Sequence, residues 1–158
     1  MIDTFLSEAL NNQMDLEFLS ARIYLALGGY LDLMNLSGFA GEMKAHAVEE
    51  ETHAMKFYEY LLDRQVPVVL GTLEAVEGVP DGFVDAFLAA VNHEKRVTQS
   101  IKDLYTMAEA LDEQTCVFLQ WFLTEQVEEE RDAEHDYSVA LAASQTPGLI
   151  YLLDKEVG

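Results

Sequence analysis

Four long segments of the sequence repeat apolar residues at intervals of three and four, the spacing of one face of an α-helix. Each of these faces is interrupted near its middle by a carboxylate, and none of them contains a lysine or an arginine. The interrupting carboxylates are Glu17, Glu50, Glu94 and Glu129. A chain that buries these faces against one another must therefore bury several acids without a lysine or arginine beside them.

The helical patterns cover residues 3–33, a segment from the turn at 35–38 to about 64, a segment from about 82 to 111, and residues 112–143. Only three prolines occur, and no segment alternates as a strand does. We expect Thr146 to cap a short fifth helix with Pro147 in its first position. The sequence predicts an all-α chain, one domain over residues 1–158, built as a four-helix bundle with a short C-terminal helix.

The connection between the second and third helices, residues 66–81, is too long for a tight turn. At about 3.3 Å per residue it spans roughly 50 Å, enough to follow a helix of about 30 residues. Five valines and leucines between positions 66 and 73 indicate that it packs on the bundle. We therefore expect a long crossover that leaves the second and third helices parallel.

The composition excludes several classes of partner. Of the 158 residues, 29 are Asp or Glu and 9 are Lys or Arg, a net charge of −20, which disfavours nucleic acid. No apolar run is long enough to span a membrane, and the first residues lack the basic end and apolar run of a secretion signal. With Cys116 as its single cysteine, the chain is expected to be cytoplasmic.

The buried carboxylates indicate a metal site. Unpaired, each would cost several kcal/mol on burial, so a cation must join them. Glu50 and His53 are three positions apart and present an oxygen and an imidazole on one helical face, a donor set that suits a transition metal. Bundles that hold two irons combine such Glu-x-x-His pairs with glutamates from other helices.

The chain resembles the bacterial non-haem ferritins over essentially its whole length. The segments that carry the resemblance are NNQMDLEF (11–18), HAVEEETH (46–53), NHEK (92–95), FLQWFLTEQVEEE (118–130) and YLLDKE (151–156). The resemblance implies a ferritin-like fold, a homo-oligomeric shell of 24 subunits, and iron storage. It also implies ferroxidase activity, in which O₂ or peroxide oxidises Fe(II) and the iron is stored as mineral.

The resemblance further implies which residues bind iron. Glu17, Glu50 and His53 would hold one iron of a di-iron centre, and Glu50, Glu94 and Glu129 the second, so that Glu50 bridges the pair.

Other positions match residues around the family's centre. Gln126 would lie near the irons, and Tyr24 would lie beside them as an electron donor or as a hydrogen-bond donor. Glu49, Glu125 and Glu128 would form a third iron site toward the cavity, shared with Glu129.

Departures from related families narrow this interpretation. Bacterioferritins carry a second Glu-x-x-His and a haem-ligating methionine, where this chain has Gln126 with Glu129 and Glu51, so no haem is expected. Mini-ferritins of the Dps type place iron between subunits, which the four-face centre disfavours. We do not expect His46 or His93 to bind metal, because His46 matches no ligand of the family and His93 is rotated by about 100° from Glu94 on the helix.

Two other functions stay open on the sequence alone. A soluble di-iron oxidase or oxygenase would need a substrate pocket at the metals, and a non-catalytic helical module would need only the fold. Iron entry is a further question, because the positions that carry acids in the three-fold pores of animal ferritins hold Cys116 and Leu119 here. Asp112 and Glu113, about one turn earlier, could still attract iron at an outer vestibule, but we expect iron to enter by another route.

Overall fold

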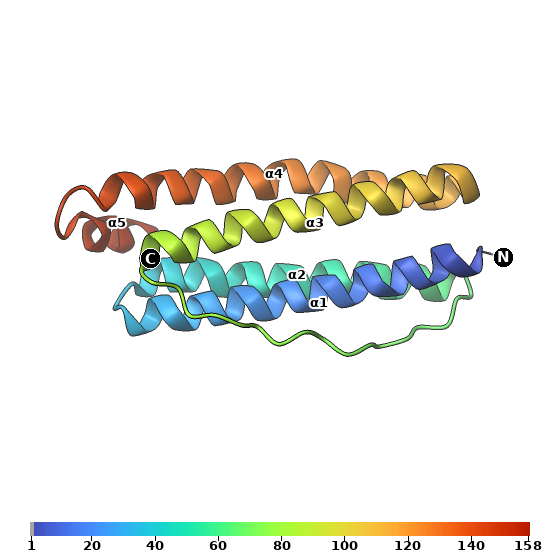
Figure 1. Ribbon diagram of the computed structural model, residues 1–158, viewed down its shortest axis with the longest axis horizontal. Helices are drawn as coiled ribbons and strands as arrows, with labels where there is room; N and C mark the ends of the chain where they lie inside the picture. Colours follow the sequence, from blue (N-terminus) through green and yellow to red (C-terminus); the bar gives the residue numbers. More distant parts are fainter. Residues whose placement is uncertain (1) are drawn as a thin grey trace.

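The predicted helices are all present in the computed structural model, which describes residues 2–158 (Figure 1). They are α1 (Thr4–Leu33), α2 (Ser37–Asp63), α3 (Phe83–Leu111), α4 (Glu113–Ala143) and α5 (Leu149–Val157). α1 packs along α2 and against α3, and α3 packs along α4, whereas α2 and α4 face each other across a wider seam. The all-α bundle with a short fifth helix is confirmed. None of the helices in residues 2–158 has the length and apolar character needed to cross a membrane.

The crossover between α2 and α3 runs along α1 for the length of the bundle, so that α2 and α3 are parallel (Figure 1). Polar side chains of α1 hold it. The Asn11 amide donates to the Pro67 carbonyl at 3.2 Å, and its oxygen accepts from the Val69 N–H at 2.7 Å. The Asp15 carboxylate accepts from the Gly71 N–H at 2.8 Å.

Apolar packing of the crossover is weaker than the sequence predicts. Val66 is buried and Val68 is partly buried against the core, but Val69 and Leu70 are exposed. The segment therefore does lie against the bundle, chiefly through backbone hydrogen bonds to α1.

A single residue separates α3 from α4. Asp112 has an extended backbone, and its side chain caps α4 by accepting from the Thr115 N–H at 3.0 Å. Arg64, which follows α2, donates to both Asp112 oxygens at 2.8 and 2.9 Å and holds the pKa of that carboxyl well below its usual range. This pair fixes the end of α2 to the start of α4.

The predicted start of the fifth helix is wrong. α5 begins at Leu149, because Gly148 before it has a φ of 80°, a left-handed conformation that a right-handed helix does not contain. Thr146 and Pro147 therefore belong to the preceding turn and not to the helix.

α5 closes one end of the bundle by capping α2. The residue before α2, Leu36, supplies no side-chain cap, and the Asp154 carboxylate of α5 accepts from the Phe39 N–H at 2.9 Å instead. Gly38 makes this close approach possible, since a Cβ there would lie 2.1 Å from the Asp154 carbonyl oxygen.

The bundle interior has an apolar cluster at each end and a polar layer between them. One cluster contains Leu6, Leu10, Phe57, Ile101, Leu119 and Phe122. The other contains Leu31, Leu36, Phe39, Phe87 and Ile150. The predicted buried faces are confirmed except at their ends, where Phe83, Ala133 and Asp136 are half-buried. The two clusters hold the polar layer at mid-bundle.

Candidate metal centre

Four buried carboxylates, one from each long helix, form the middle of the polar layer. Glu17, Glu50, Glu94 and Glu129 are all less than 9% exposed. The burial of each carboxylate follows from its position in a helical repeat of apolar residues, which places its side chain inward. Within residues 2–158 the side chains that form ion pairs with them are His46 and His53, and no lysine or arginine does so.

Glu17, Glu50 and His53 offer ligand atoms that lie within 4.8 Å of one another. The His53 Nδ1 lies 3.0 Å from a Glu50 oxygen. One Glu17 oxygen accepts from the Gln13 amide at 2.8 Å, while the other is buried without any hydrogen-bond partner. An unpartnered buried carboxylate oxygen is costly, and a metal cation bound here would satisfy it. The donors suit iron, which accepts imidazole and carboxylate ligands.

Glu94 lies in the same layer with both of its oxygens engaged. One accepts from the Tyr24 hydroxyl, and the other accepts from the Gln126 amide at 3.1 Å. The Gln126 amide also donates to the Thr98 hydroxyl oxygen at 3.2 Å. The structure thus brings Glu94, Tyr24 and Gln126 together, but it does not place Glu94 in the close group of Glu17, Glu50 and His53.

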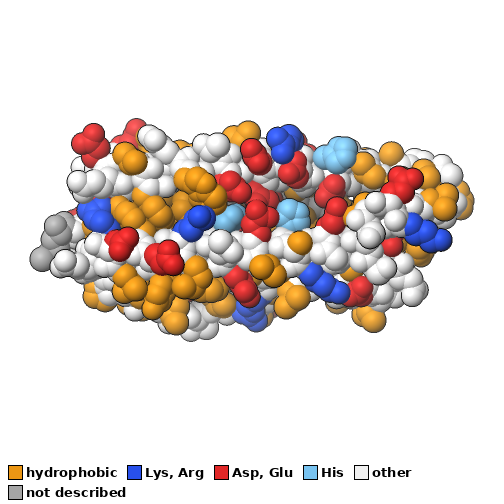
Figure 2. All heavy atoms as spheres, turned by 180° about the vertical axis from the view of Figure 1, so that it is seen from behind, with side chains coloured by type: hydrophobic (Ala, Val, Ile, Leu, Met, Phe, Trp, Pro, Cys, Tyr) orange, Lys and Arg blue, Asp and Glu red, His pale blue; other side chains and the backbone are white. Residues whose placement is uncertain are grey.

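A second close group lies on the seam between α2 and α4. Glu49, His53, Glu125 and Glu129 offer atoms within 4.8 Å of one another. Figure 2 shows acidic and histidine side chains gathered at the middle of one face of the molecule. Glu128, predicted from the family resemblance as part of this site, is exposed and lies outside the group, whereas His53 joins it.

His46 and His93, which we did not expect to bind metal, have different surroundings. His46 stacks on Tyr24 with ring centroids 5.1 Å apart, and its Nδ1 lies 3.7 Å from oxygens of both Glu49 and Glu129. The buried His93 has its Nε2 2.7 Å from the Ser20 hydroxyl. Neither ring belongs to a close ligand group.

Burial raises the pKa values of all four carboxyl groups. Loss of water, followed by the charge of Glu94, raises the pKa of Glu50 and of Glu129 to about 9. The pKa of Glu17 and that of Glu94 are also raised, chiefly by burial. With pKa values of about 9, Glu50 and Glu129 hold protons at neutral pH without a metal, and a bound cation would displace these protons.

Sequence reasoning assigned no role to three polar residues that orient the carboxylates. Gln13 donates to Glu17, and the Ser100 hydroxyl donates to the Gln13 amide oxygen at 2.5 Å. Thr98 accepts from Gln126. The spacing of four between Gln13 and Glu17 was a usable signal, whereas the contacts of Ser100 and Thr98 cross between helices and have none in the sequence.

The pore comparison made from sequence is not supported by the positions of its residues. Leu119 is fully buried in an apolar cluster, and Cys116 is buried beside it. A side chain packed inside its own bundle does not line an opening between subunits. The route by which iron enters stays a prediction.

Known proteins share both the sequence and the fold. The ferritin family, described as a ferritin-like domain, matches residues 7–135. The bacterial non-heme ferritin of Staphylococcus epidermidis is 34% identical over 158 residues, covering 99% of this chain and 95% of that protein. That of Staphylococcus aureus strain USA300 is 33% identical over 159 residues, covering 100% and 96%.

Solved structures give the same result. An open pore ferritin from the hyperthermophilic archaeon Archaeoglobus fulgidus superposes with a TM-score of 0.92 at 33% identity, covering 99% of this chain and 96% of the other. A structure described as a humanized archaeal ferritin gives a TM-score of 0.94 at 33% identity with the same coverage.

Proposed function

Since the chain belongs to the ferritin family and is an iron-storage ferritin, we propose that it oxidises Fe(II) in its buried carboxylate layer before storing the iron. The observation that carries this proposal is the unpartnered buried oxygen of Glu17 beside Glu50 and His53. A bundle that needed only a stable core would not retain four buried acids without a lysine or arginine among them.

In this proposal Glu17, Glu50 and His53 bind one Fe(II), and Glu50, Glu94 and Glu129 bind the second. Each Fe(II) gives up one electron, and O₂ takes both electrons and two protons to become hydrogen peroxide. The carboxyl groups of Glu50 and Glu129, whose pKa values are about 9 without metal, release protons as Fe(II) binds. Tyr24 and Gln126 hold the Glu94 carboxylate in position through their hydrogen bonds.

The group on the α2/α4 seam supplies the third iron site. Glu49 and Glu125 are partly or fully exposed, so this site would exchange iron with the surroundings more readily than the buried layer. We place Glu49, Glu125 and Glu129 in it, with Glu128 at its margin.

Further parts of the proposal concern the assembly. The subunits would form a 24-subunit shell without haem, in the cytoplasm, where the free Cys116 stays reduced. O₂ is proposed as the oxidant, with peroxide as the alternative.

The test is rapid mixing of the anaerobically Fe(II)-loaded protein with O₂. Wild type is expected to bind two Fe(II) per subunit and oxidise them in a fast phase that Glu50→Ala removes. Glu51→Ala, at the exposed neighbouring position, is the control. Binding without fast oxidation would overturn the proposal. Electron microscopy separates storage from an oxidase with an organic substrate, because only storage requires a hollow shell with electron-dense content.

A further inference from the structure

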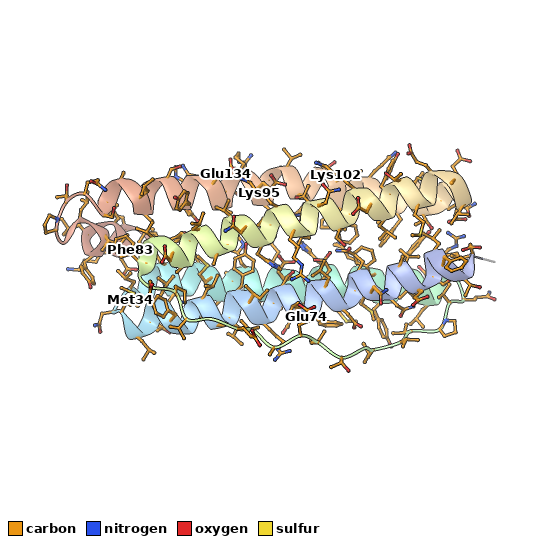
Figure 3. The ribbon with its side chains drawn as sticks, viewed as in Figure 1. Met34, Glu74, Phe83, Lys95, Lys102 and Glu134 are labelled. Carbon is orange, nitrogen blue, oxygen red and sulfur yellow. The ribbon has the colours of Figure 1, made fainter. Side chains whose placement is uncertain are left out.

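A groove of about 720 Å³ lies between α1, α3 and the crossover, on the side of the bundle away from the α2/α4 seam. Its walls are mainly apolar and include Leu19, Ile23, Leu27, Val76, Val79 and Ala89. The crossover, on which Glu74 lies (Figure 3), forms its outer wall. Two arginines hold the crossover at Glu74: Arg22 of α1 donates to the Glu74 carbonyl at 3.2 Å, and Arg96 of α3 pairs with the Glu74 carboxylate at 3.5 Å.

The floor of this groove adjoins the metal centre. His93 lines the groove, hydrogen-bonds to Ser20, and meets the Tyr24 ring edge-on with centroids 6.3 Å apart. Tyr24 in turn donates to Glu94. Ser20 is one helical turn from Glu17, and His93 directly precedes Glu94. His93, Ser20 and Tyr24 therefore connect the floor of the groove to two of the carboxylates.

The lining decides which reactant this groove suits. A hydrated Fe(II) ion would lose water among aliphatic side chains, whereas a small apolar gas enters apolar cavities without that cost. A second groove of about 410 Å³, between α3 and α4, also reaches Gln126, but half of its eight lining residues are charged: Lys102, Glu130, Arg131 and Glu134. The first groove has four charged residues among its seventeen, Glu74, Glu77, Asp85 and Arg96, so its lining is the more apolar of the two. The salt bridge of 2.8 Å between Lys95 and Glu134 lies across the same pair of helices (Figure 3).

We propose that the groove between α1, α3 and the crossover is the O₂ portal of the centre, with His93 and Ser20 as the barrier that O₂ crosses. This inference rests on the proposed ferroxidase function. The reaction balances as before: two Fe(II) become two Fe(III), and O₂ with two protons becomes hydrogen peroxide.

The experiment fills the groove from opposite walls without touching the centre. Ala89→Phe adds a ring from α3, and Ala26→Phe adds one from the exposed side of α1. The matched control is Ala110→Phe, at an exposed position of α3 outside the groove. All variants are loaded anaerobically with two Fe(II) per subunit as assembled protein and then mixed with O₂ or with hydrogen peroxide.

The portal predicts that both groove variants lower the second-order rate constant for O₂ about tenfold, equivalent to a barrier raised by about 1.4 kcal/mol. Fe(II) stoichiometry and the rate with the polar oxidant peroxide stay at wild-type values, as does every rate of Ala110→Phe. Unchanged O₂ rates, or equal slowing with O₂ and peroxide, would overturn the portal while leaving the ferroxidase intact. Loss of fast oxidation in wild type would instead overturn the proposed function.

A binding measurement checks the groove without any turnover. Crystals of the metal-free protein under xenon pressure are expected to show xenon in the groove of wild type and none there in Ala89→Phe, because xenon occupies apolar cavities as O₂ does. Xenon found at other places and absent from the wild-type groove would contradict the portal.

Discussion

The two sides of the carboxylate layer differ in chemistry. Toward the α2/α4 seam lie the acidic side chains of Glu49, which is exposed, and Glu125, which is partly exposed. Toward the α1/α3 side lie aliphatic walls and His93, which is buried and whose pKa is lowered to about 4, chiefly by burial, so that it is neutral. The difference suggests that a cationic substrate and an apolar oxidant approach the same centre from opposite sides, each through surroundings that match it.

Burying the carboxylate layer between the two sides costs free energy of folding. Its carboxyl groups lose water on folding, and the apolar clusters at both ends of the bundle supply the compensating stability. Variants that alter one side, the other side or the layer itself should therefore give separable effects.

The largest effect is expected in the layer. Glu50→Ala should abolish the fast phase of Fe(II) oxidation, because Glu50 contributes to both proposed binding positions, whereas His53→Ala should weaken mainly one. Stopped-flow absorbance after anaerobic loading measures both. Fast oxidation of two irons per subunit in Glu50→Ala would place the chemistry elsewhere.

The second effect is a dependence of stability on pH. The pKa values of Glu50 and Glu129 are about 9 in the folded, metal-free protein, well above their usual values near 4.5. Their stabilising contribution is fully present below about pH 4.5 and is lost progressively as pH rises from there to about 9. We expect the melting temperature of the metal-free protein to fall between pH 7 and pH 9, and a bound divalent metal to oppose the fall.

The matched variants for this prediction are Glu50→Gln and Glu129→Gln, which keep the shape and remove the titration. Each should flatten the fall of melting temperature over the same pH range, measured by calorimetry. A melting temperature in wild type that does not fall across this range would show that the carboxyl groups ionise without penalty.

A smaller effect is expected at Tyr24, which borders both sides of the layer. Tyr24→Phe removes the hydrogen bond to Glu94, and a loss of about 0.5–1.5 kcal/mol corresponds to roughly two- to tenfold slower oxidation. Freeze-quench spin resonance of wild type distinguishes the alternative role. A tyrosyl radical formed during the fast phase, and absent from Tyr24→Phe, would show that Tyr24 donates an electron.

The smallest effect is expected on the acidic seam. Glu125→Ala should slow later turnovers about threefold and leave the first burst nearly unchanged, consistent with the modest value of partly exposed charges. Glu51→Ala is the control, because Glu51 is exposed and lies outside the ligand group. Repeated additions of Fe(II) in the stopped-flow instrument measure both. A slowed first burst in Glu125→Ala would make the seam part of the primary centre.

Much of the fold could be predicted from helical periodicity alone. The spacing of three and four places Glu17, Glu50, Glu94 and Glu129 on the buried faces, and the structure buries all of them. The length of the crossover likewise predicts parallel α2 and α3. These features are local or depend on chain length, which the sequence states directly.

Features that depend on contacts between distant segments could not be predicted. Asp154 caps α2 from α5, and Asn11 holds the crossover, through contacts that no periodicity encodes.

The start of α5 was predicted wrongly because the left-handed conformation of Gly148 outweighs the usual preference for proline in a first helical turn. His53 joins the seam group and Glu128 does not, because the seam geometry and not the sequence spacing decides which atoms meet.

The most direct test of the account is anomalous X-ray scattering at the iron edge from crystals soaked anaerobically in Fe(II). The account predicts two iron peaks per subunit in the buried layer, one beside Glu17 and His53 and one beside Glu94 and Glu129, with Glu50 between them. Iron confined to the exposed acids of the α2/α4 seam, with the Glu17 oxygen still unpartnered, would contradict it.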